Sequence, residues 1–374
     1  MNRVDKPHVV HVIDELPPDG AERLIVDVLQ NRSDRFRYSV LCIVAGGQMV
    51  DELRAIGVPV TILNRKRGLD LGTVPALVRW YKQERVDVVH THLYAADSYG
   101  RAAALLAGVR GRFSTRHNTN AWGSRGRRAI AWLLGRASHK VIGCGEAVGG
   151  FLTDVEGLPA DKVTVIANGI NLRRFDGVDR GALRRELGVA DSTVVMGVIG
   201  RLHEQKGHAD LLIALEALNR THPDFVCVLA GSGELKDKIE ADARARGLES
   251  KVRLLGQRKD IPNVLAGLDL FVMPSLWEGL PMAMLEAMAL ATPVLSTNVG
   301  SIPSVIDDGQ DGLLVPPAQP ERLTAALQKL MADPAWRRQL GEAGKATVVA
   351  HFNAAHTAAA YEALYLESLG RPVA

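Results

Sequence analysis

The sequence predicts an α/β protein made of two doubly wound parallel sheets with helices on both faces. The chain has 374 residues, more than one hydrophobic core usually supports, and fits two domains of ordinary size. Short β-branched runs alternate with longer helical stretches, as expected of βαβ units whose strands are buried on both faces. The pattern starts again after residue 180, so we expect two open sheets with a ligand cleft at their strand ends.

The first domain is expected over residues 1–175. Its candidate strands lie at 9–13, 38–44, 58–63, 86–92, 112–115, 140–144 and 163–166. Helical stretches separate them at 21–30, 74–84, 98–107, 125–135 and 146–156. The N-terminal VVHVI run is too short for a signal peptide and is typical of a first buried strand.

The second domain is expected over residues 176–350, after a polar, glycine-containing linker near 170–180. Its candidate strands lie at 193–200, 225–231, 252–256, 268–274, 292–297 and 312–315. No strand is expected after the helical segments beyond residue 334, so these helices must pack on the sheets and helices formed by the preceding residues.

Composition excludes several classes of protein. The formal charge is +3, from 45 basic and 42 acidic residues, and argues against a nucleic-acid partner. The three cysteines, Cys42, Cys144 and Cys227, have no metal-binding spacing, and a reducing compartment fits them. No apolar run reaches the roughly 18–20 residues that span a bilayer. We therefore expect a soluble, cytoplasmic protein.

Two loops that follow strands of the second domain carry candidate anion-binding groups. Arg201 and Lys206 lie between a strand and a helix, where two cations could receive a phosphate or diphosphate. A solvated surface loop is the alternative interpretation. Gly231 and Gly233 match the start of a dinucleotide-binding fingerprint, but Lys236 replaces its third glycine. This departure argues against a dehydrogenase, and a tight turn without ligand explains the glycines equally well.

The stretch SLWEGLPMAMLEAMAL at 275–290 places two carboxylates in an otherwise apolar segment. Glu278 precedes a helix whose first turn holds Pro281, and Glu286 lies in its second turn. Backbone N–H groups at this helix start can bind an anion, while the carboxylates can accept hydrogen bonds from hydroxyls. The alternatives are a favourable interaction of Glu278 with the helix dipole and a solvent-facing Glu286.

In the first domain, the candidate site residues also follow strands. Gly20 lies in a turn where a backbone could approach a ligand, and His117 follows the strand at 112–115. His90 and His92 share one face of a strand, but no third metal ligand at suitable spacing is evident, so we expect packing at the strand end.

Residues 122–140 contain a basic helix. At about 100° per residue, Ile130, Leu133, Leu134 and Ala137 form one face. The opposite face holds Trp132 and a group of cationic residues, Arg125, Arg128, Arg136, His139 and Lys140. This composition suits an anionic membrane surface, and the alternative is a solvated helix whose tryptophan packs on a neighbouring element.

Taken together, these motifs resemble the family-4 retaining glycosyltransferases of the GT-B fold over nearly the whole chain. The most specific part is Glu278-Gly-Leu-Pro-Met-Ala-Met-Leu-Glu286, which resembles the E-x7-E motif of that family. The following TPVLSTNVGSIPSVIDDGQDGLLVPP is similar to its usual continuation. The resemblance implies two Rossmann-like domains facing across a cleft, with residues 351–374 packing back on the first domain.

The resemblance also implies roles in binding the donor. Glu286 would hold the ribose hydroxyls and Glu278 the hydroxyls of the transferred sugar, while Arg201 and Lys206 would hold the diphosphate. Backbone contacts would come from Gly20, Gly231, Leu254, Gly279, Leu280 and Pro281.

The catalytic set implied in this way is His117, Arg201, Lys206 and Glu278, with His117 facing the reacting sugar. In the first loop, Asp19-Gly20 replaces the family's usual Gly-Gly, and an aspartate would repel a diphosphate. No Asp-x-Asp occurs in the chain, so the carboxylate pair that usually holds a cation on a nucleotide sugar is missing. We expect no metal and no cofactor.

The implied activity is that of a metal-independent, retaining hexosyltransferase. It would move a sugar from a UDP- or GDP-linked donor to a hydroxyl of a glycan or lipid-linked acceptor, as in the synthesis of cell-surface polysaccharide. Two alternatives remain open, an epimerase of nucleotide sugars with a GT-B-like fold and a non-catalytic subunit that binds nucleotide or glycan. Peripheral binding at the inner membrane face would fit the basic helix.

Overall fold

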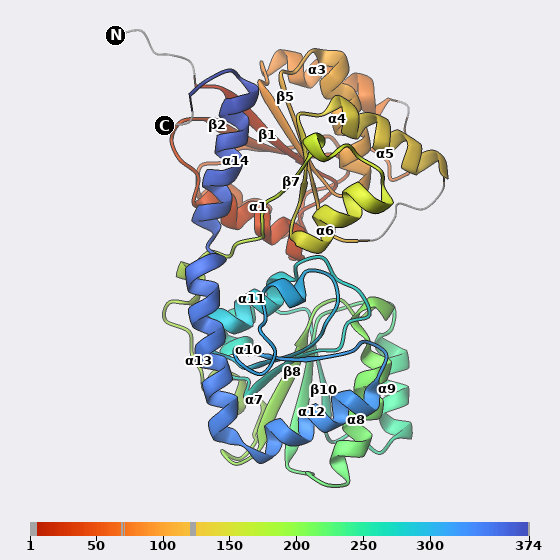
Figure 1. Cartoon of the computed structure of the whole chain (residues 1–374), viewed down its shortest axis with the longest axis vertical. Coiled ribbons are helices and arrows are strands. Elements are labelled where there is room, and N and C mark those ends of the chain that lie inside the picture. Colours follow the sequence, from red (N-terminus) through yellow and green to blue (C-terminus); the bar gives the residue numbers. More distant parts are fainter. Residues whose placement is uncertain (1–5, 69, 71, 120–124, 373–374) are drawn as a thin grey trace. The chain divides into compact units, whose positions relative to one another are not determined.

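The computed structural model describes residues 6–68, 70, 72–119 and 125–372 (Figure 1). The chain forms two compact units. Unit 1 comprises Met1–Asn171 together with Asn353–Ala374, and unit 2 comprises Leu172–Phe352. The C-terminal segment thus belongs to the same unit as the N-terminal half of the chain.

Unit 1 contains a seven-stranded parallel sheet in the order β3-β2-β1-β4-β5-β6-β7. Every strand expected for the first domain is present, and its ends differ from the expected ones by at most two residues. The strands are β1 (His8–Ile13), β2 (Arg37–Cys42), β3 (Val60–Ile62), β4 (Val88–His92), β5 (Gly111–Arg116), β6 (Lys140–Gly143) and β7 (Val163–Val165).

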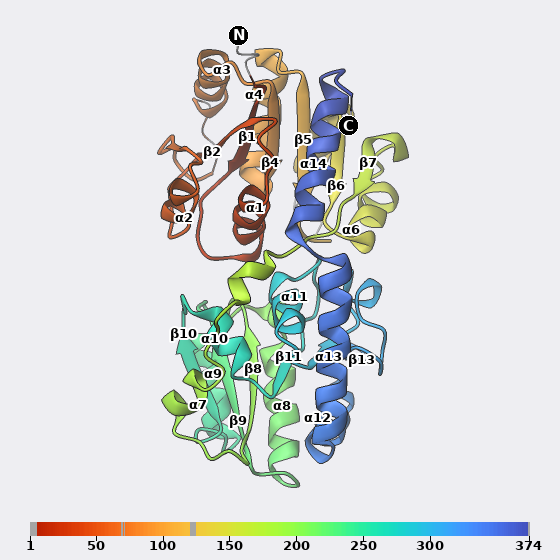
Figure 2. The same ribbon diagram turned by 90° about the vertical axis from the view of Figure 1, so that its left-hand side faces the viewer.

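The helices of unit 1 cover both faces of this sheet (Figure 2). They are α1 (Gly20–Gln30), α2 (Val50–Ala55), α3 (Thr73–Gln83), α4 (Tyr94–Ala107), α5 (Arg125–Ala137), α6 (Glu146–Gly150) and α14 (Ala354–Ser368). The stretch expected to be helical at 146–156 is α6 continued by a π-helical turn at Phe151–Val155. Helix α2 was not expected from the sequence.

The C-terminal helix α14 packs on unit 1 beside α1 (Figure 2). Its Glu362 accepts hydrogen bonds from the hydroxyl of Tyr38 and the backbone N–H of Ser33, both at 2.8 Å. Its Tyr365 is fully buried, and the hydroxyl lies 2.6 Å from Nδ1 of His90. Polar contacts as well as apolar packing therefore fix α14 on the sheet.

Unit 2 contains a six-stranded parallel sheet in the order β10-β9-β8-β11-β12-β13. All strands expected for the second domain are present. They are β8 (Val194–Ile199), β9 (Phe225–Ala230), β10 (Val252–Gly256), β11 (Leu270–Met273), β12 (Val294–Thr297) and β13 (Leu313–Val315). With unit 1, this sheet confirms the predicted fold class of two Rossmann-like, doubly wound α/β domains.

The helices of unit 2 again lie on both faces of its sheet (Figure 1). They are α7 (Ala182–Leu187), α8 (His208–Asn219), α9 (Lys236–Ala245), α10 (Ile261–Ala266), α11 (Met282–Ala289), α12 (Pro320–Ala332) and α13 (Pro334–His351). Helix α11 is apolar almost all round, because it packs on the sheet on one side and against α13 on another. Within the described residues, no helix has both the length and the hydrophobicity that crossing a bilayer requires.

Helix α5 buries a different face from the one its apolar residues suggest. Its buried positions are Ala131 and Gly135, whereas Ile130 and Leu133 are 50% and 60% exposed. Trp132 is partly buried, and its Nε1 donates to the carbonyl of Gly157 at 3.0 Å. The tryptophan therefore packs on a neighbouring element, as in the alternative interpretation, and the surface of α5 presents isoleucine and leucine instead. Residues 122–124 of the predicted basic segment lie outside the described residues.

Candidate active site

The loop after β8 holds both cations that the sequence singled out. Lys206 ends a short 3-10 turn at Glu204–Lys206, and Gly207 follows in the left-handed conformation. A Cβ on Gly207 would lie 1.9 Å from the carbonyl oxygen of Pro274, so a larger residue cannot occupy this position without moving the loop after β11. This close approach places Lys206 next to Glu278.

Glu278 is the centre of a polar cluster in unit 2. Its carboxylate is buried and receives Nζ of Lys206 at 2.6 Å and the hydroxyl of Ser275 at 2.8 Å on Oε1. Nε2 of Gln205 donates to the other oxygen at 3.2 Å. One buried carboxylate with one cation and two neutral donors is electrostatically balanced, so the cluster can hold its shape before any ligand arrives.

Glu286 lies on α11 and is paired with a different cation. Its Oε1 accepts a hydrogen bond from Nη1 of Arg174 at 2.7 Å, and the carboxylate is buried. Arg174 lies in the 3-10 turn Leu172–Phe175 at the start of unit 2. The solvent-facing alternative for Glu286 is thus wrong. Sequence reasoning missed Arg174, although a run of two arginines beside the domain boundary was the available signal.

The other donor-site candidates of unit 2 occupy nearby loops. Arg201 is exposed just after β8, and no hydrogen bond or ion pair of its side chain is found within the described residues. Pro281 is the N-cap of α11, and the carbonyl of Gly279 accepts the N–H of Ser301 at 2.8 Å. Leu254 is a half-buried residue of β10.

Gly231 directly follows β9 and has φ +154°, a conformation that residues with a side chain rarely adopt. A Cβ at this position would lie 1.8 Å from the carbonyl oxygen of Gly200 in the loop after β8. The loops that follow β8 and β9 are therefore in direct backbone-to-backbone contact, with no room for a side chain between them. This contact accounts for Gly231 without any ligand, as the tight-turn interpretation supposes.

Unit 1 brings together histidines from three neighbouring strand ends. Nδ1 of His11 in β1 lies 3.0 Å from Nε2 of His92 in β4, and Nδ1 of His92 lies 3.2 Å from Nε2 of His117. His90 bonds Tyr365 and Thr115 instead. His11, His90 and His92 have ligand atoms within 4.8 Å of one another, but these hydrogen bonds occupy both ring nitrogens of His90 and His92. Packing at the strand end is therefore what the structure shows for this pair.

The chain of three imidazoles links the proton positions of its members. A neutral imidazole has one N–H and one lone pair, so His92 must donate one of its two bonds and accept the other. The His11–His92 and His92–His117 hydrogen bonds therefore both point toward His117 or both point toward His11. If His92 donates to His117, Nδ1 of His117 carries a proton; if His117 donates to His92, that nitrogen is an acceptor. The row of imidazoles ends at Nε2 of His11, which is buried and has no hydrogen-bond partner among the residues that the structure describes.

We expect the stability of unit 1 to fall between pH 7 and pH 5. Burial lowers the pKa of His117 to about 4 and that of His11 to about 3, and it holds the pKa of His90 and His92 well below the ordinary value. Below about pH 6.5, these histidines are therefore protonated in the unfolded chain but stay neutral in the folded chain, so a fall in pH favours unfolding. Each histidine can contribute up to about 1.4 kcal/mol per pH unit. Two carboxyl groups oppose this trend: burial raises the pKa of Asp14 to about 6 and also raises the pKa of Glu156.

Amide hydrogen exchange at both pH values measures this expectation, after correction for the intrinsic exchange rate. Peptides that cover β4 should lose more protection at pH 5 than peptides that cover β9 of unit 2, the internal control. In unit 2 burial lowers the pKa of one histidine, His208, whereas unit 1 has the four named above. An equal loss in both peptides would contradict the assignment to the buried histidines.

The remaining candidate of unit 1, Gly20, starts α1 after the N-cap Asp19. The side chain of Asp19 makes no capping hydrogen bond, and both residues are exposed. The helix start is thus accessible, with an acidic residue beside it. The structure leaves the roles of Gly20 and His117 toward a donor as predictions.

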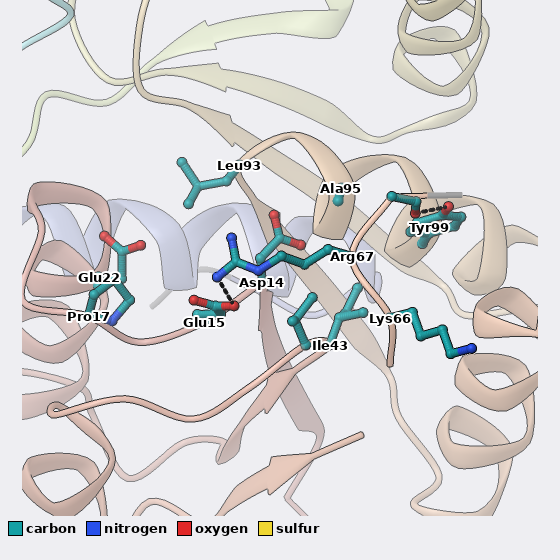
Figure 3. Close-up of a pocket in the computed structure, with 12 residues that line it drawn as sticks. Asp14, Glu15, Pro17, Glu22, Ile43, Lys66, Arg67, Leu93, Ala95 and Tyr99 are labelled. Carbon is teal, nitrogen blue, oxygen red and sulfur yellow. Dashed lines mark hydrogen bonds and ion pairs between the residues drawn. The ribbon is translucent and has the colours of Figure 1, made fainter. Parts of the chain in front are cut away.

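A cavity of about 300 Å³ lies within unit 1, near this loop (Figure 3). Its walls come from the ends of β1, β2 and β4, the loop after β3 and the start of α4. Asp14 and Glu15 line it directly after β1. Sequence reasoning missed these two residues, although their position immediately after the first strand was a usable signal.

Comparison with known proteins places the chain in a family. Residues 179–347 match the family model described as glycosyl transferases group 1, and residues 8–174 match the model described as glycosyltransferase family 4. The chain belongs to the group 1 glycosyltransferases of the family-4 type. It is an enzyme of the glycosyltransferase class, and the resemblance seen in the sequence is confirmed.

Curated relatives extend over most of the chain. The Escherichia coli UDP-Gal:alpha-D-GlcNAc-diphosphoundecaprenol alpha-1,3-galactosyltransferase is 30% identical over 298 residues, which are 76% of this chain and 77% of that protein. The putative glycosyltransferase EpsF of Bacillus subtilis is 30% identical over 332 residues and covers 83% of each chain. Both relatives are named as glycosyltransferases.

Solved structures agree with the fold. Anabaena Alr3699/HepE in complex with UDP and glucose superposes with a TM-score of 0.85 at 23% identity, covering 97% of this chain and 99% of that chain. Sucrose-phosphate synthase of Thermosynechococcus elongatus gives a TM-score of 0.81 at 20% identity, with the same coverage. These similarities confirm the GT-B fold.

Proposed function

We propose that this glycosyltransferase transfers a sugar, with retention of anomeric configuration and without a metal ion, from a nucleotide diphosphate sugar to an acceptor hydroxyl. The observation that supports the proposal most is the Glu278 cluster. It places Lys206 and a buried carboxylate at the carboxyl ends of β8 and β11, with the exposed Arg201 in the same loop as Lys206. Cations bind a diphosphate, and a carboxylate accepts hydrogen bonds from sugar hydroxyls.

The chemistry follows from where negative charge develops. As the bond between the anomeric carbon and the diphosphate oxygen breaks, the leaving group gains charge. Arg201 and Lys206 can stabilise that charge more in the transition state than in the bound donor. The acceptor oxygen forms its bond on the face from which the diphosphate departs, and its proton passes to an oxygen of the leaving diphosphate. This route needs neither an enzyme nucleophile nor a cation other than these side chains.

The nature of the donor and acceptor rests on the relatives. Structures similar in fold carry UDP and glucose, and the Escherichia coli relative is named for transfer from UDP-Gal to a diphosphoundecaprenol-linked sugar. We infer a UDP- or GDP-linked hexose as donor and a glycan or lipid-linked sugar as acceptor. Synthesis of a cell-surface polysaccharide would use such a reaction.

A donor screen tests this proposal. UDP- and GDP-hexoses are incubated with the protein and a panel of glycosides in the presence of a chelator, and products are followed by proton NMR. The expected product is a new glycoside whose anomeric coupling matches that of the donor. Loss of turnover in the chelator would refute metal independence, and an inverted coupling would refute retention. Conversion of donor without any acceptor would favour the epimerase, and absence of all turnover would favour a non-catalytic subunit.

We further propose that α5 brings unit 1 to an anionic membrane surface, on the inner face of the cytoplasmic membrane. Its exposed face combines Ile130 and Leu133 with exposed arginines at positions 125, 127, 128 and 136. Apolar side chains inserted among lipid headgroups, with cations beside them, are what binding to an anionic interface requires. A lipid-linked acceptor would make such binding useful.

Vesicle flotation measures this binding. Replacing both Ile130 and Leu133 by Ser should remove about 2–3 kcal/mol of apolar burial, and so weaken binding to phosphatidylglycerol vesicles at least tenfold. The matched control replaces Ile213 and Val349, which are 37% and 46% exposed on unit 2, by Ser. Equal losses in both double variants, or equal binding to neutral vesicles, would remove α5 as the membrane contact.

A further inference from the structure

His117 has a ring nitrogen that takes part in no hydrogen bond within the described protein. His117 lies directly after β5 and is partly buried, and Nδ1 of His92 lies 3.2 Å from its Nε2. Its Nδ1 has no hydrogen-bond partner among the residues that the structure describes. Whether this Nδ1 is a hydrogen-bond donor or an acceptor decides which atoms of a ligand it can bind. The row of imidazoles formed by His11, His92 and His117 determines which of the two it is.

Each imidazole of the row is neutral near pH 7. His11 and His92 are buried, and burial lowers the pKa of His11 to about 3 and holds the pKa of His92 well below the ordinary value. Burial also lowers the pKa of His117, to about 4. No carboxylate of the described residues hydrogen-bonds to any of the three rings, so none compensates a positive charge there. Each ring therefore carries one proton, and the direction of one hydrogen bond fixes that of the other.

The buried end of the row at His11 decides this direction. Nε2 of His11 has no partner within the described part of the chain, so it presents either an unpaired N–H or an unpaired lone pair. In proteins a buried N–H without an acceptor is rarer than a buried acceptor without a donor. The neighbouring rings of Tyr38, His90 and His92 lie at only 28°, 32° and 18° to the plane of the imidazole, so none turns a face toward an N–H in that plane. The lone pair is therefore on Nε2, and the proton of His11 is on Nδ1.

The proton positions of the other two rings follow from this end. His11 donates from Nδ1 to Nε2 of His92 at 3.0 Å, so His92 carries its own proton on Nδ1. His92 donates that proton to Nε2 of His117 at 3.2 Å, which leaves the single proton of His117 on Nδ1. The nitrogen of His117 that has no partner is therefore an N–H donor. Since the row ends at a buried lone pair, it orients His117 and offers no onward route for a proton.

We propose that His11 and His92 are positioning residues, which keep His117 in the tautomer with its proton on Nδ1 so that it donates a hydrogen bond to an oxygen of the transferred sugar. The assignment rests on the proposed function, because that function supplies the sugar. An imidazole without these neighbours could carry its proton on either nitrogen and would present a donor only part of the time. A fixed N–H needs no rearrangement when the sugar binds or when the glycosidic bond breaks. The atom that it selects is a hydroxyl or ether oxygen, which has a lone pair to accept with.

Nitrogen-15 NMR of the histidine side chains tests the tautomer without any substrate. Protonated and unprotonated ring nitrogens have well-separated shifts, so long-range proton–nitrogen correlation spectra show which nitrogen of His117 carries the proton. The signal of His117 is identified by its loss in His117→Asn. Nδ1 of His203 accepts the backbone N–H of Gln205 at 3.1 Å, so neutral His203 must show the opposite tautomer and provides the internal reference.

Two substitutions of His92 separate orientation from packing. His92→Asn places an amide N–H close to the position of Nδ1 and can still donate to His117, whereas His92→Leu cannot. We expect His117 to keep its proton on Nδ1 in the first variant and to show both tautomers in the second. In the transferase assay, kcat/KM for the nucleotide sugar should fall about tenfold in His92→Leu, the usual effect of losing one hydrogen bond, and stay near the wild-type value in His92→Asn.

The matched control is His8→Leu. His8 is a buried histidine of β1 that bonds Ser39 at 2.7 Å and lies outside the row. Its replacement should lower the melting temperature but leave both the tautomer of His117 and kcat/KM unchanged. Circular dichroism and thermal unfolding show whether each variant is folded.

The outcomes separate this inference from the proposed function. A wild-type His117 with its proton on Nε2, or a folded His92→Leu variant in which His117 keeps its proton on Nδ1, would overturn the inference. Equal losses of kcat/KM in His92→Leu and His92→Asn would also overturn it. A tautomer that depends on His92, in a protein without transferase turnover, would support the positioning roles and refute the proposed reaction. Turnover with an unchanged kcat/KM in folded His92→Leu would support the reaction and refute the positioning roles.

Discussion

Replacing Lys206 by Ala should reduce kcat by about 10²- to 10³-fold, the usual effect of removing one electrostatic stabiliser of a developing negative charge. Lys206 lies 2.6 Å from Glu278, so the substitution also removes the cation from a buried carboxylate. We therefore expect a lower melting temperature as well. Initial rates at saturating donor, together with thermal unfolding, measure the two effects separately.

The matched control for this variant is Lys236→Ala. Lys236 lies on α9 of the same unit, is 60% exposed and forms only a loose contact of 3.8 Å with Glu240. Its removal should change neither rate nor stability measurably, since exposed ion pairs contribute little. A Lys206→Ala variant with wild-type kcat would show that the diphosphate is stabilised elsewhere.

Gly231→Ala should cost unit 2 much of its stability. The new Cβ would lie 1.8 Å from the carbonyl oxygen of Gly200, and the backbone has φ +154°. Neither backbone can move without distorting the ends of β8 and β9, so we expect a loss of about 3–5 kcal/mol, in the range of the most destabilising single substitutions. Denaturant unfolding of unit 2, followed by hydrogen exchange in β9, measures this loss.

Gly247→Ala is the control that separates the cost of the backbone conformation from the cost of steric crowding. Gly247 also has a positive φ, +66°, but a Cβ there would meet nothing within 4 Å. Its substitution should cost only about 1 kcal/mol. Similar losses in both variants would mean that the contact between the two loops is not what requires glycine at position 231.

Most strands were predictable from sequence because they are short runs rich in β-branched residues and are buried on both faces. The edge strands β3, β7 and β10 are only partly buried, but their β-branched or apolar residues still mark them. The helix starts were less predictable. Helix α4 begins at Tyr94 rather than near residue 98, because its N-cap is Leu93, in a strained conformation with φ 61°, and not one of the polar residues that usually mark a helix start. Helix α2, with six residues, is too short to show a helical period.

The candidate site was only partly predictable, for a related reason. The rule that ligands bind after parallel strands selected Arg201, Lys206, Glu278 and His117 from sequence alone. It could not pair Lys206 with Glu278, because these residues lie 72 positions apart and their contact depends on the turn at Gly207. The unsatisfied nitrogen of His11 is likewise a property of the folded strands.

The return of α14 to unit 1 has a consequence for the order of synthesis. Tyr361 and Tyr365 pack against His90 of β4 and Phe113 of β5, yet they follow the whole of unit 2 in the sequence. Unit 2, encoded without interruption, can complete its fold while unit 1 still lacks a helix. During synthesis, unit 1 therefore becomes complete only after the whole of unit 2 has been made.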